Sequence, residues 1–345
     1  MSKIGNKKIL LIAEILAIAC ILCVTVFTSA FYALDAMLCD KLYTDMEGVS
    51  RDIRIIAIDE ETLDEYGSFS TWSREKSAEL IEILCADKEN MPLAIGMDIL
   101  FTGETGKDAD LRLAEATENA CPVIFASNLV YRGAAKQDDS GKIYYDTMNV
   151  ETVEEPYEAL REVSENGFTN AFVAADGCVR YTKLFENNNT EAKSFAWMLY
   201  EKYETFYSRK PVIPQMNEAG QLNFFYSGRV GEFSHVSMKS VLDGTVPVRE
   251  FKDFIVLVGA YAPGFQDAYV SAAQRRNPMY RVEIQANIIQ ALMDGKTALA
   301  VSPWMYRAVV CPLTCIFFFI AQKQKLIPAI AESLEIGRAS CRERV

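Results

Sequence analysis

The apolar positions of this chain form two long runs near its ends and a series of short runs between them. Residues 9–34 are almost unbroken hydrocarbon with Glu14 as their only charge, and residues 303–322 form a second run that opens with Trp304 and Tyr306. At about 1.5 Å of rise per residue, each run can cross the roughly 30 Å apolar core of a bilayer as a helix. We therefore predict transmembrane helices over 9–34 and 303–322.

The charges beside these runs predict their orientation. Lysines precede the first run and follow the second, whereas Asp35 and Asp40 follow the first. By the positive-inside rule, residues 1–8 and 323–334 are cytoplasmic, the latter as a turn and the start of a further apolar segment, and residues 35–302 lie outside. The alternative for the first run is a cleavable signal peptide, whose apolar stretch is usually only about 7 to 15 residues long.

Between the two runs, short β-branched stretches alternate with stretches of helical periodicity. Strands are predicted over 54–58, 93–100 and 122–127, with helices over 73–87, with Ser73 as N-cap, and 108–120, whose Leu111, Leu113 and Ala114 face inward. This alternation predicts an α/β domain with a mixed, partly parallel sheet, right-handed crossovers and flanking helices. The fold class is thus an extracytoplasmic α/β domain that transmembrane helices anchor at both ends.

The second half of this domain is less regular. Residues 131–165 are polar and predict a surface excursion, in which a turn near 136–141 separates two short strands. Asp176-Gly177 predicts the turn of a hairpin between strands at 168–174 and 179–185. The remaining predicted elements are a helix over 194–207, strands over 222–226 and 254–260, and a helix over 283–292 that leads toward the second apolar run.

Charged residues near predicted strand ends are the candidates for a ligand site. In parallel sheets ligands meet the carboxyl ends of the strands, and Asp59 and Asp98 stand at such ends. The alternative, which we slightly favour, is that both are ordinary strand-end caps. The full set of candidate ligand-binding residues, which could instead form structural ion pairs, is Asp59, Arg74, Asp98, Asp176, Arg180 and Asp267.

Several classes of function find no support in the sequence. The formal net charge of −12 argues against a nucleic-acid partner, because phosphate binding needs a basic surface. The single histidine, His235, has no nucleophile pattern beside it, and the glycine-containing stretch at 258–267 lacks the lysine of a phosphate-binding loop. We therefore predict no catalytic residue, metal or cofactor.

The nine cysteines do not form a regular framework. Most lie in the apolar runs or the C-terminal tail, and those predicted outside the membrane are Cys39, Cys85, Cys121 and Cys178. They are scattered singly without metal-ligand spacing, which predicts buried free thiols rather than a zinc site or a disulfide scaffold.

Six sequence pieces, in this order, resemble the type 2 CHASE domain, an extracellular sensory domain. They are IRIIAIDEETL, TWSREKSAELI, IGMDILF, NAFVAADGCVRYTKLF, FIVLVGAYAPGFQDAY and VEIQANIIQALMDG. The chain departs from the family at residues 68–72, where a Trp-Pro-Trp-like stretch is more typical. The resemblance implies reception of an unidentified extracellular ligand, a homodimer, and control of a cytoplasmic cyclase or kinase, most plausibly an adenylate or guanylate cyclase.

The C-terminal residues 335–345, EIGRASCRERV, differ abruptly from the apolar segment before them. We interpret them as a translated sequencing-adapter read-through, which implies a gene truncated before its output domain; the alternative is a native basic juxtamembrane stretch. Three hypotheses follow: a sensor that controls a cytoplasmic enzyme, a stand-alone membrane-tethered binding or assembly protein, and an extracytoplasmic hydrolase. The last needs a nucleophile or metal constellation that the sequence does not show.

Overall fold

The computed structural model describes residues 48–137, 143–186 and 191–299, together with Ala36, Asp40, Pro312, Leu313 and Ile316. Residues 36–300 form one structural unit, which is the subject of this section. Within the described ranges, no helix is both long enough and apolar enough to cross a membrane. The predicted spans lie outside those ranges except for three residues of 303–322, and so do residues 1–8 and 323–345.

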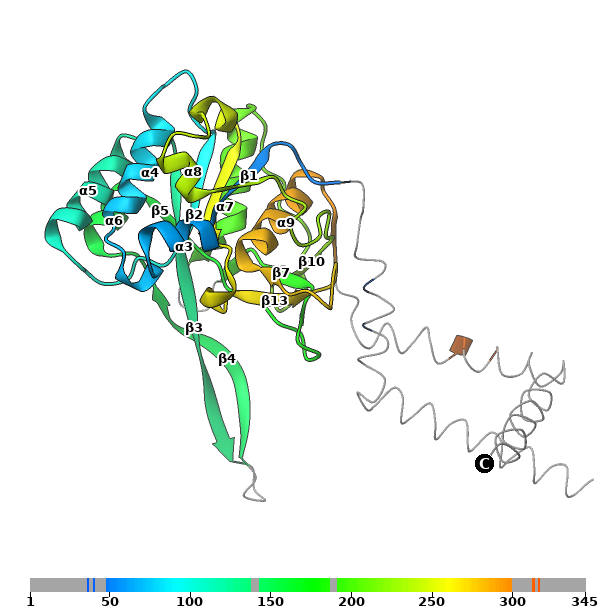
Figure 1. Cartoon of the computed structure of the whole chain (residues 1–345). Coiled ribbons are helices and arrows are strands. Elements are labelled where there is room, and N and C mark those ends of the chain that lie inside the picture. Colours follow the sequence, from blue (N-terminus) through cyan, green and yellow to red (C-terminus); the bar gives the residue numbers. More distant parts are fainter. Residues whose placement is uncertain are drawn as a thin grey trace, which may run out of the picture. The chain divides into compact units, whose positions relative to one another are not determined.

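A seven-stranded sheet is the centre of this unit (Figure 1). Its order is β11-β1-β12-β2-β3-β4, and β5 pairs with the inner half of β3. All neighbours are parallel except β3 and β4. The strands are β1 (Ile53–Ile58), β2 (Ala94–Asp98), β3 (Val123–Gln137), β4 (Ile143–Glu154), β5 (Glu165–Phe168), β11 (His235–Ser237) and β12 (Ile255–Ala260).

Helices cover both faces of the sheet, which gives three layers (Figure 1). Strands buried on both sides require this cover, and their uninterrupted apolar sequences reflect it. One face carries α3 (Glu60–Tyr66), α4 (Glu75–Cys85), α5 (Lys107–Glu118), α6 (Glu158–Val163) and α8 (Met238–Leu242). The other face carries α7 (Phe195–Phe206) and α9 (Arg281–Met293). The 3₁₀ turns are η1 (Phe69–Thr71), η2 (Val248–Phe251) and η3 (Pro263–Phe265).

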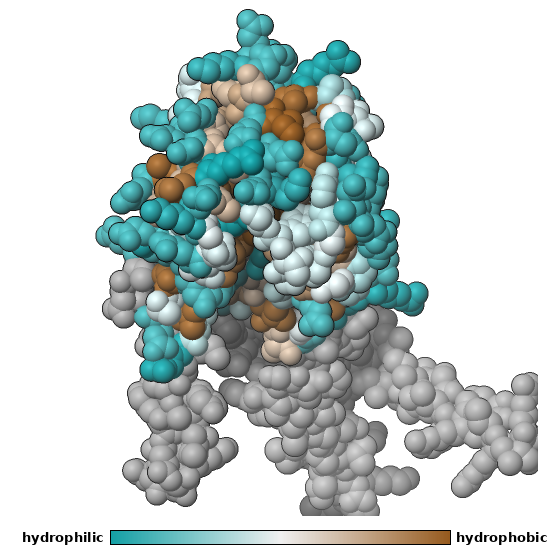
Figure 2. Space-filling view, turned by 60° about the vertical axis from the view of Figure 1, so that its left-hand side comes forward, coloured by the Kyte–Doolittle hydropathy of each residue, from teal (hydrophilic) through white to brown (hydrophobic). Residues whose placement is uncertain are grey.

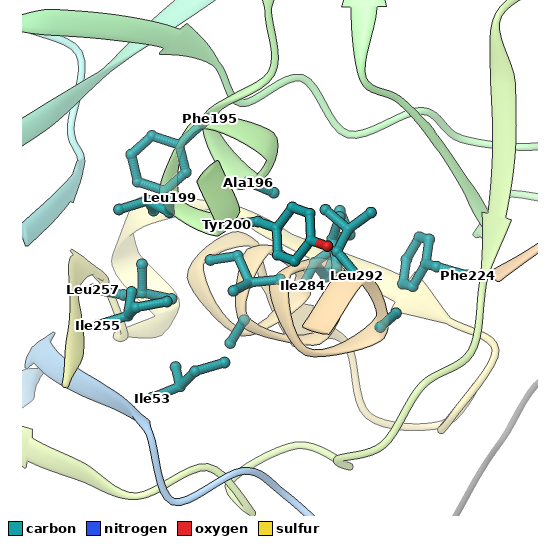
Figure 3. Close-up of a cluster of buried hydrophobic side chains, with 14 of the residues drawn as sticks. Ile53, Phe195, Ala196, Leu199, Tyr200, Phe224, Ile255, Leu257, Ile284 and Leu292 are labelled. Carbon is teal, nitrogen blue, oxygen red and sulfur yellow. The ribbon is translucent and has the colours of Figure 1, made fainter. Parts of the chain in front are cut away.

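The core on the α7 and α9 face is closely packed. Figure 3 shows Phe195 and Leu199 of α7 and Ile284 of α9 directed toward strand residues such as Leu257, and these side chains are fully or almost fully buried. A glycine lets α7 approach β5: a Cβ at Gly167 would lie 2.7 Å from the backbone N and Cα of Phe195. Helix α7 therefore packs against the sheet at a position where a side chain on β5 would not fit.

Short strands join the loops around α9 into small sheets. Their orders are β15-β10-β7, β14-β13-β6 and β8-β9. Their bounds are β6 (Cys178–Val179), β7 (Tyr181–Lys183), β8 (Phe185–Glu186), β9 (Ala192–Lys193), β10 (Gln221–Phe224), β13 (Ala268–Ser271), β14 (Met279–Tyr280) and β15 (Thr297–Ala298).

Most predicted elements are confirmed, and the mixed, partly parallel α/β sheet is as expected. Two predictions are wrong in detail. Helix α4 has Arg74, not Ser73, as its N-cap, and Leu111 of α5 is 43% exposed rather than inward. The two strands expected on either side of the turn near 136–141 are present but are longer than predicted, and they form the β3–β4 ribbon that extends beyond the other strands in Figure 1.

The predicted hairpin around Asp176-Gly177 forms only its turn. Gly177 has a φ of 82°, in the region that glycine favours, and the Ala174 N–H donates to the Cys178 carbonyl at 2.9 Å. The flanking residues then pair elsewhere, β6 with β13 and β7 with β10, because those distant strands bury them. Only the isolated bridge between Val173 and Val179 remains of the hairpin.

Candidate functional site

One charged cluster lies at the carboxyl edge of the sheet, where α9 begins. Asp98 ends β2 and is 3% exposed. Arg281, the first residue of α9, lies between two carboxylates: its Nε is 3.1 Å from Asp98 Oδ1, and its Nη2 is 3.2 Å from Asp267 Oδ2. The Arg281 backbone N–H also donates to the Asp267 carbonyl at 3.0 Å. We call Asp98, Asp267 and Arg281 the edge cluster.

The edge cluster contains two acidic side chains and only one basic side chain. Burial raises the pKa of Asp98, against the opposing effect of the Arg281 guanidinium, and burial also raises the pKa of Asp267. The Arg281 Nε–H donates to Asp98 Oδ2 at 3.2 Å. Asp98 Oδ1, although close to Nε, has no hydrogen bond of its own within the described residues, because the N–H points to the other oxygen. Two carboxylates therefore share one cation.

A second buried acid, Glu283, lies in the first turn of α9. Its Oε1 accepts hydrogen bonds from the Gly231 N–H at 2.7 Å and from the Tyr261 hydroxyl at 3.0 Å. Its Oε2 is buried and has no hydrogen bond among the described residues. Burial raises the pKa of Glu283. The N-terminal turn of α9 thus brings the edge cluster and Glu283, whose carboxyl groups all have pKa values raised by burial, to one end of the helix.

The remaining polar residues of α9 hold loops by their backbone groups. Asn287 Oδ1 accepts hydrogen bonds from the N–H groups of Ser227 and Gly228, both at 3.0 Å. Gln285 Nε2 donates to the Thr169 carbonyl at 3.2 Å. All residues from 282 to 292 are buried, so each polar side chain needs such a partner.

Gln290 connects the last turn of α9 to the beginning of the described domain. Its Nε2 donates to the Gly48 carbonyl at 3.0 Å, and its Oε1 accepts from the Ser50 N–H at 2.9 Å. Shortly after α9, β15 pairs with β10 and the described chain reaches Leu299. Residues 48–50, just before β1, and the segment after α9 therefore lie beside the C-terminal part of the helix that begins at the edge cluster.

A second charged cluster contains Asp40, Asp176, Arg180 and Arg275, which we call the clamp cluster. Arg180 lies 2.5 Å from Asp40 and 2.7 Å from Asp176, and Arg275 lies 2.7 Å and 2.8 Å from the same two carboxylates. Hydrogen bonds from Arg180 and Arg275 hold the pKa of Asp176 well below its usual range. This network ties Asp40, which precedes β1, to the loops around β6 and β13.

Two other sequence candidates have local structural partners. Asp59 caps α3, since its Oδ1 accepts from the Thr62 N–H at 3.0 Å and from the Ser237 hydroxyl at 2.8 Å. This is the strand-end cap that was the alternative to a ligand role. Arg74 is buried, pairs with Asp110 at 2.7 Å, and lies over the Tyr157 ring at 4.2 Å.

The structure thus brings the six predicted residues to four separate places. Asp98 and Asp267 lie together because both pair with Arg281, and Asp176 pairs with Arg180. Asp59 and Arg74 contact none of the other five predicted residues. Sequence reasoning missed Arg281, Glu283 and Gln290. The available signal was the presence of several polar residues in an otherwise apolar helix, because a helix buried on all sides keeps polar residues only where they have partners.

Among the described residues, no arrangement of side chains indicates a metal site. They contain no group of three His, Cys, Asp or Glu side chains placed to hold a metal ion. His235 stacks on Tyr261, with ring centroids 4.9 Å apart.

An open groove of about 630 Å³ lies between the base of the β3–β4 ribbon and α7, and its lining includes Glu151, Glu165 and Lys193. The face shown in Figure 2 is mainly hydrophilic, and its hydrophobic residues form separate groups.

Comparison with known families identifies the chain. A model of the CHASE2 domain matches residues 16–321, which is most of the sequence. The chain therefore belongs to the CHASE2 domain family. CHASE2 is an extracellular sensory domain that is usually found in signalling proteins, and it is not itself a catalytic domain. Comparisons with curated proteins and with solved structures gave no match.

Proposed function

We propose that this chain is the extracytoplasmic, membrane-anchored sensory part of a receptor that controls a cytoplasmic enzyme, with an adenylate or guanylate cyclase as the first candidate. The proposal rests on the position of α9 between the edge cluster and the segment before β1. The helix begins at the edge cluster and, through Gln290, holds the backbone at Gly48 and Ser50 near its other end. A ligand at the edge cluster would therefore act on the helix that holds the segment before β1 and leads toward the apolar run at 303–322.

The edge cluster suits a ligand that supplies positive charge or hydrogen-bond donors. Two carboxylates share the single Arg281 guanidinium, and Asp98 Oδ1 has no hydrogen bond within the described residues. The side chains of Arg281 and Asp267 remain 23% and 18% exposed, so solvent reaches them. A ligand shifts the receptor only if it binds one arrangement of this cluster more tightly than another.

An exposed apolar surface supports the membrane-proximal placement of the C-terminal end of α9. Val212 and Leu299 are 71% and 46% exposed, and together with Leu292 they line one groove. Leu299 lies four residues before the apolar run at 303–322. Lys210, which has no ion pair in the described part of the chain, adds a positive charge nearby. Aliphatic and basic groups in this combination suit a lipid interface.

The experiment that tests this placement compares two reporter fusions. Alkaline phosphatase, which is active only outside the cytoplasm, is joined after Leu299 in one and after Leu334 in the other. We expect phosphatase activity from the first fusion alone. Activity from the second, or from neither at matched expression, contradicts the proposed topology.

The output is identified separately by sequencing genomic DNA beyond the codon for Leu334. We expect an open frame that continues into a cyclase or kinase domain. A native frame that encodes residues 335–345 and then stops would favour the stand-alone membrane-tethered binding protein. Because such outputs act as dimers in proteins that resemble this one, we also propose a homodimer.

A further inference from the structure

Two cysteines that are far apart in the sequence are neighbours in the structure. Cys85 ends α4 and Cys121 lies two residues before β3, and their sulfur atoms are 3.6 Å apart although 36 residues separate them. Both are free thiols in the structure, as predicted, although their separation in the sequence did not indicate that they lie in contact. The third described cysteine, Cys178, is buried and has no such neighbour among the described residues.

Both residues of the pair lie near the surface of the domain. Cys85 is half-buried, and Cys121, although only 7% exposed, lines an open groove of about 500 Å³ together with Glu118 and Pro122. Their shared hydrogen bond lowers the pKa of Cys85 to about 7, and the same bond and burial raise the pKa of Cys121. Cys85 is the more accessible of the two thiols, which suits the attacking cysteine.

We propose that Cys85 and Cys121 form a disulfide in the mature protein and that the thiol pair is the site of a redox modification. The separation of 3.6 Å places the sulfur atoms in contact, so a small side-chain movement suffices to reach the bond length of about 2.05 Å. The inference rests on the proposed function only for its compartment, because disulfides persist in oxidising environments outside the cytoplasm.

The oxidant belongs to the class of disulfide donors, either a small-molecule disulfide or the reactive disulfide of a thiol oxidase. The Cys85 thiolate attacks one donor sulfur, the donor S–S bond breaks, and one donor thiol leaves with a proton. Cys121, as its thiolate, then attacks the Cys85 sulfur of the mixed disulfide and releases the second donor thiol, which takes up the other proton. Two protein thiols are oxidised, and the donor receives the electron pair.

The bond would close a loop that contains β2 and α5. Asp98 of the edge cluster ends β2, so the redox state of the pair would constrain the segment that carries one of the edge carboxylates. A loop of this length raises the stability of a domain this size enough to increase its melting temperature by roughly 5–10 °C.

The test uses the full chain in detergent, incubated with mixtures of oxidised and reduced glutathione. Peptides are then mapped by mass spectrometry without reduction. We expect a peptide pair linked through Cys85 and Cys121, and a rise in melting temperature that dithiothreitol reverses. Cys178→Ser, the matched control, should retain both properties. Cys85→Ser and Cys121→Ala should lose both, while their circular dichroism spectra remain those of the reduced wild type.

Three outcomes decide the matter. A chain in which both cysteines stay free or carry only glutathione at an oxidising ratio overturns the proposal. The linked peptide in detergent and also in chains isolated from alkylated cells supports it. The linked peptide in detergent but not in cells overturns the claim for the mature protein, and the Leu299 phosphatase fusion then shows whether the compartment, and with it the proposed function, is the part that fails.

Discussion

Gln290 offers the sharpest test of the connection between α9 and the ends of the domain. We consider Gln290→Leu, which keeps the size of a side chain that is only 4% exposed but removes its amide. The hydrogen bonds to the Gly48 carbonyl and from the Ser50 N–H are then lost. At about 0.5–1.5 kcal/mol for each bond, the segment that begins the domain loses about 1–3 kcal/mol of local stability.

This loss is measurable as hydrogen exchange. Since 1.4 kcal/mol corresponds to a factor of ten, the Ser50 amide should exchange about 5- to 150-fold faster in Gln290→Leu than in the wild type. Gln285→Leu is the matched control, because Gln285 is a buried glutamine of the same helix whose amide donates to the Thr169 carbonyl instead. It should leave Ser50 exchange unchanged. Equal Ser50 exchange rates in both variants would refute the assignment of Gln290 as the connection.

Three further perturbations test other parts of the account. Arg180→Met leaves two buried carboxylates with a single arginine, and we expect a loss of about 3 kcal/mol in unfolding free energy at pH 7; a loss under about 1 kcal/mol contradicts this. Gly167→Ala forces a Cβ against the Phe195 backbone and should cost about 1–3 kcal/mol, whereas Gly264→Ala, in open space, should change stability by less than about 0.5 kcal/mol; equal urea midpoints would argue against close packing. The raised pKa of Glu283 makes the folded state hold its proton more tightly, so its contribution to stability is present below the unfolded value of 4.5 and lost as pH rises through the folded pKa. Glu283→Gln should remove that part of the fall in stability above pH 4.5, and an unaltered pH profile would contradict it.

The sequence predicted the elements whose burial leaves a periodic or continuous apolar pattern. Strands β1, β2 and β12 are apolar because helices cover both of their faces. The helix expected over 194–207 is α7, and the Ser194 side chain caps it by accepting from the Trp197 N–H. The strands on either side of the turn near 136–141 were expected to be short, whereas β3 continues without a break from the predicted strand at 122–127 into the ribbon. The hairpin at Gly177 failed because distant strands compete for the residues beside a correctly predicted turn.

The candidate site was predictable only as separate residues. The position of Asp98 at a strand end follows from local pattern, but its partner Arg281 is 183 residues away, and Asp40 is 140 residues from Arg180. Such pairs depend on the sheet order, in which β12 lies between β1 and β2. The Cys85–Cys121 contact has the same origin, since the end of α4 and the beginning of β3 meet only after β2 and α5 have been placed.

The central claim, that the edge cluster acts through α9 on a cytoplasmic output, is tested most directly by an enzymatic reporter. An adenylate cyclase catalytic domain is joined after Leu334 in the full chain, and cyclic AMP production is compared in membranes containing wild type, Arg281→Lys and Arg112→Lys at matched expression. Arg112 is the control because it forms a half-exposed pair with Glu82. We expect a several-fold change in cyclic AMP output for Arg281→Lys alone. Identical output from all three proteins would show that the edge cluster does not act on the output domain.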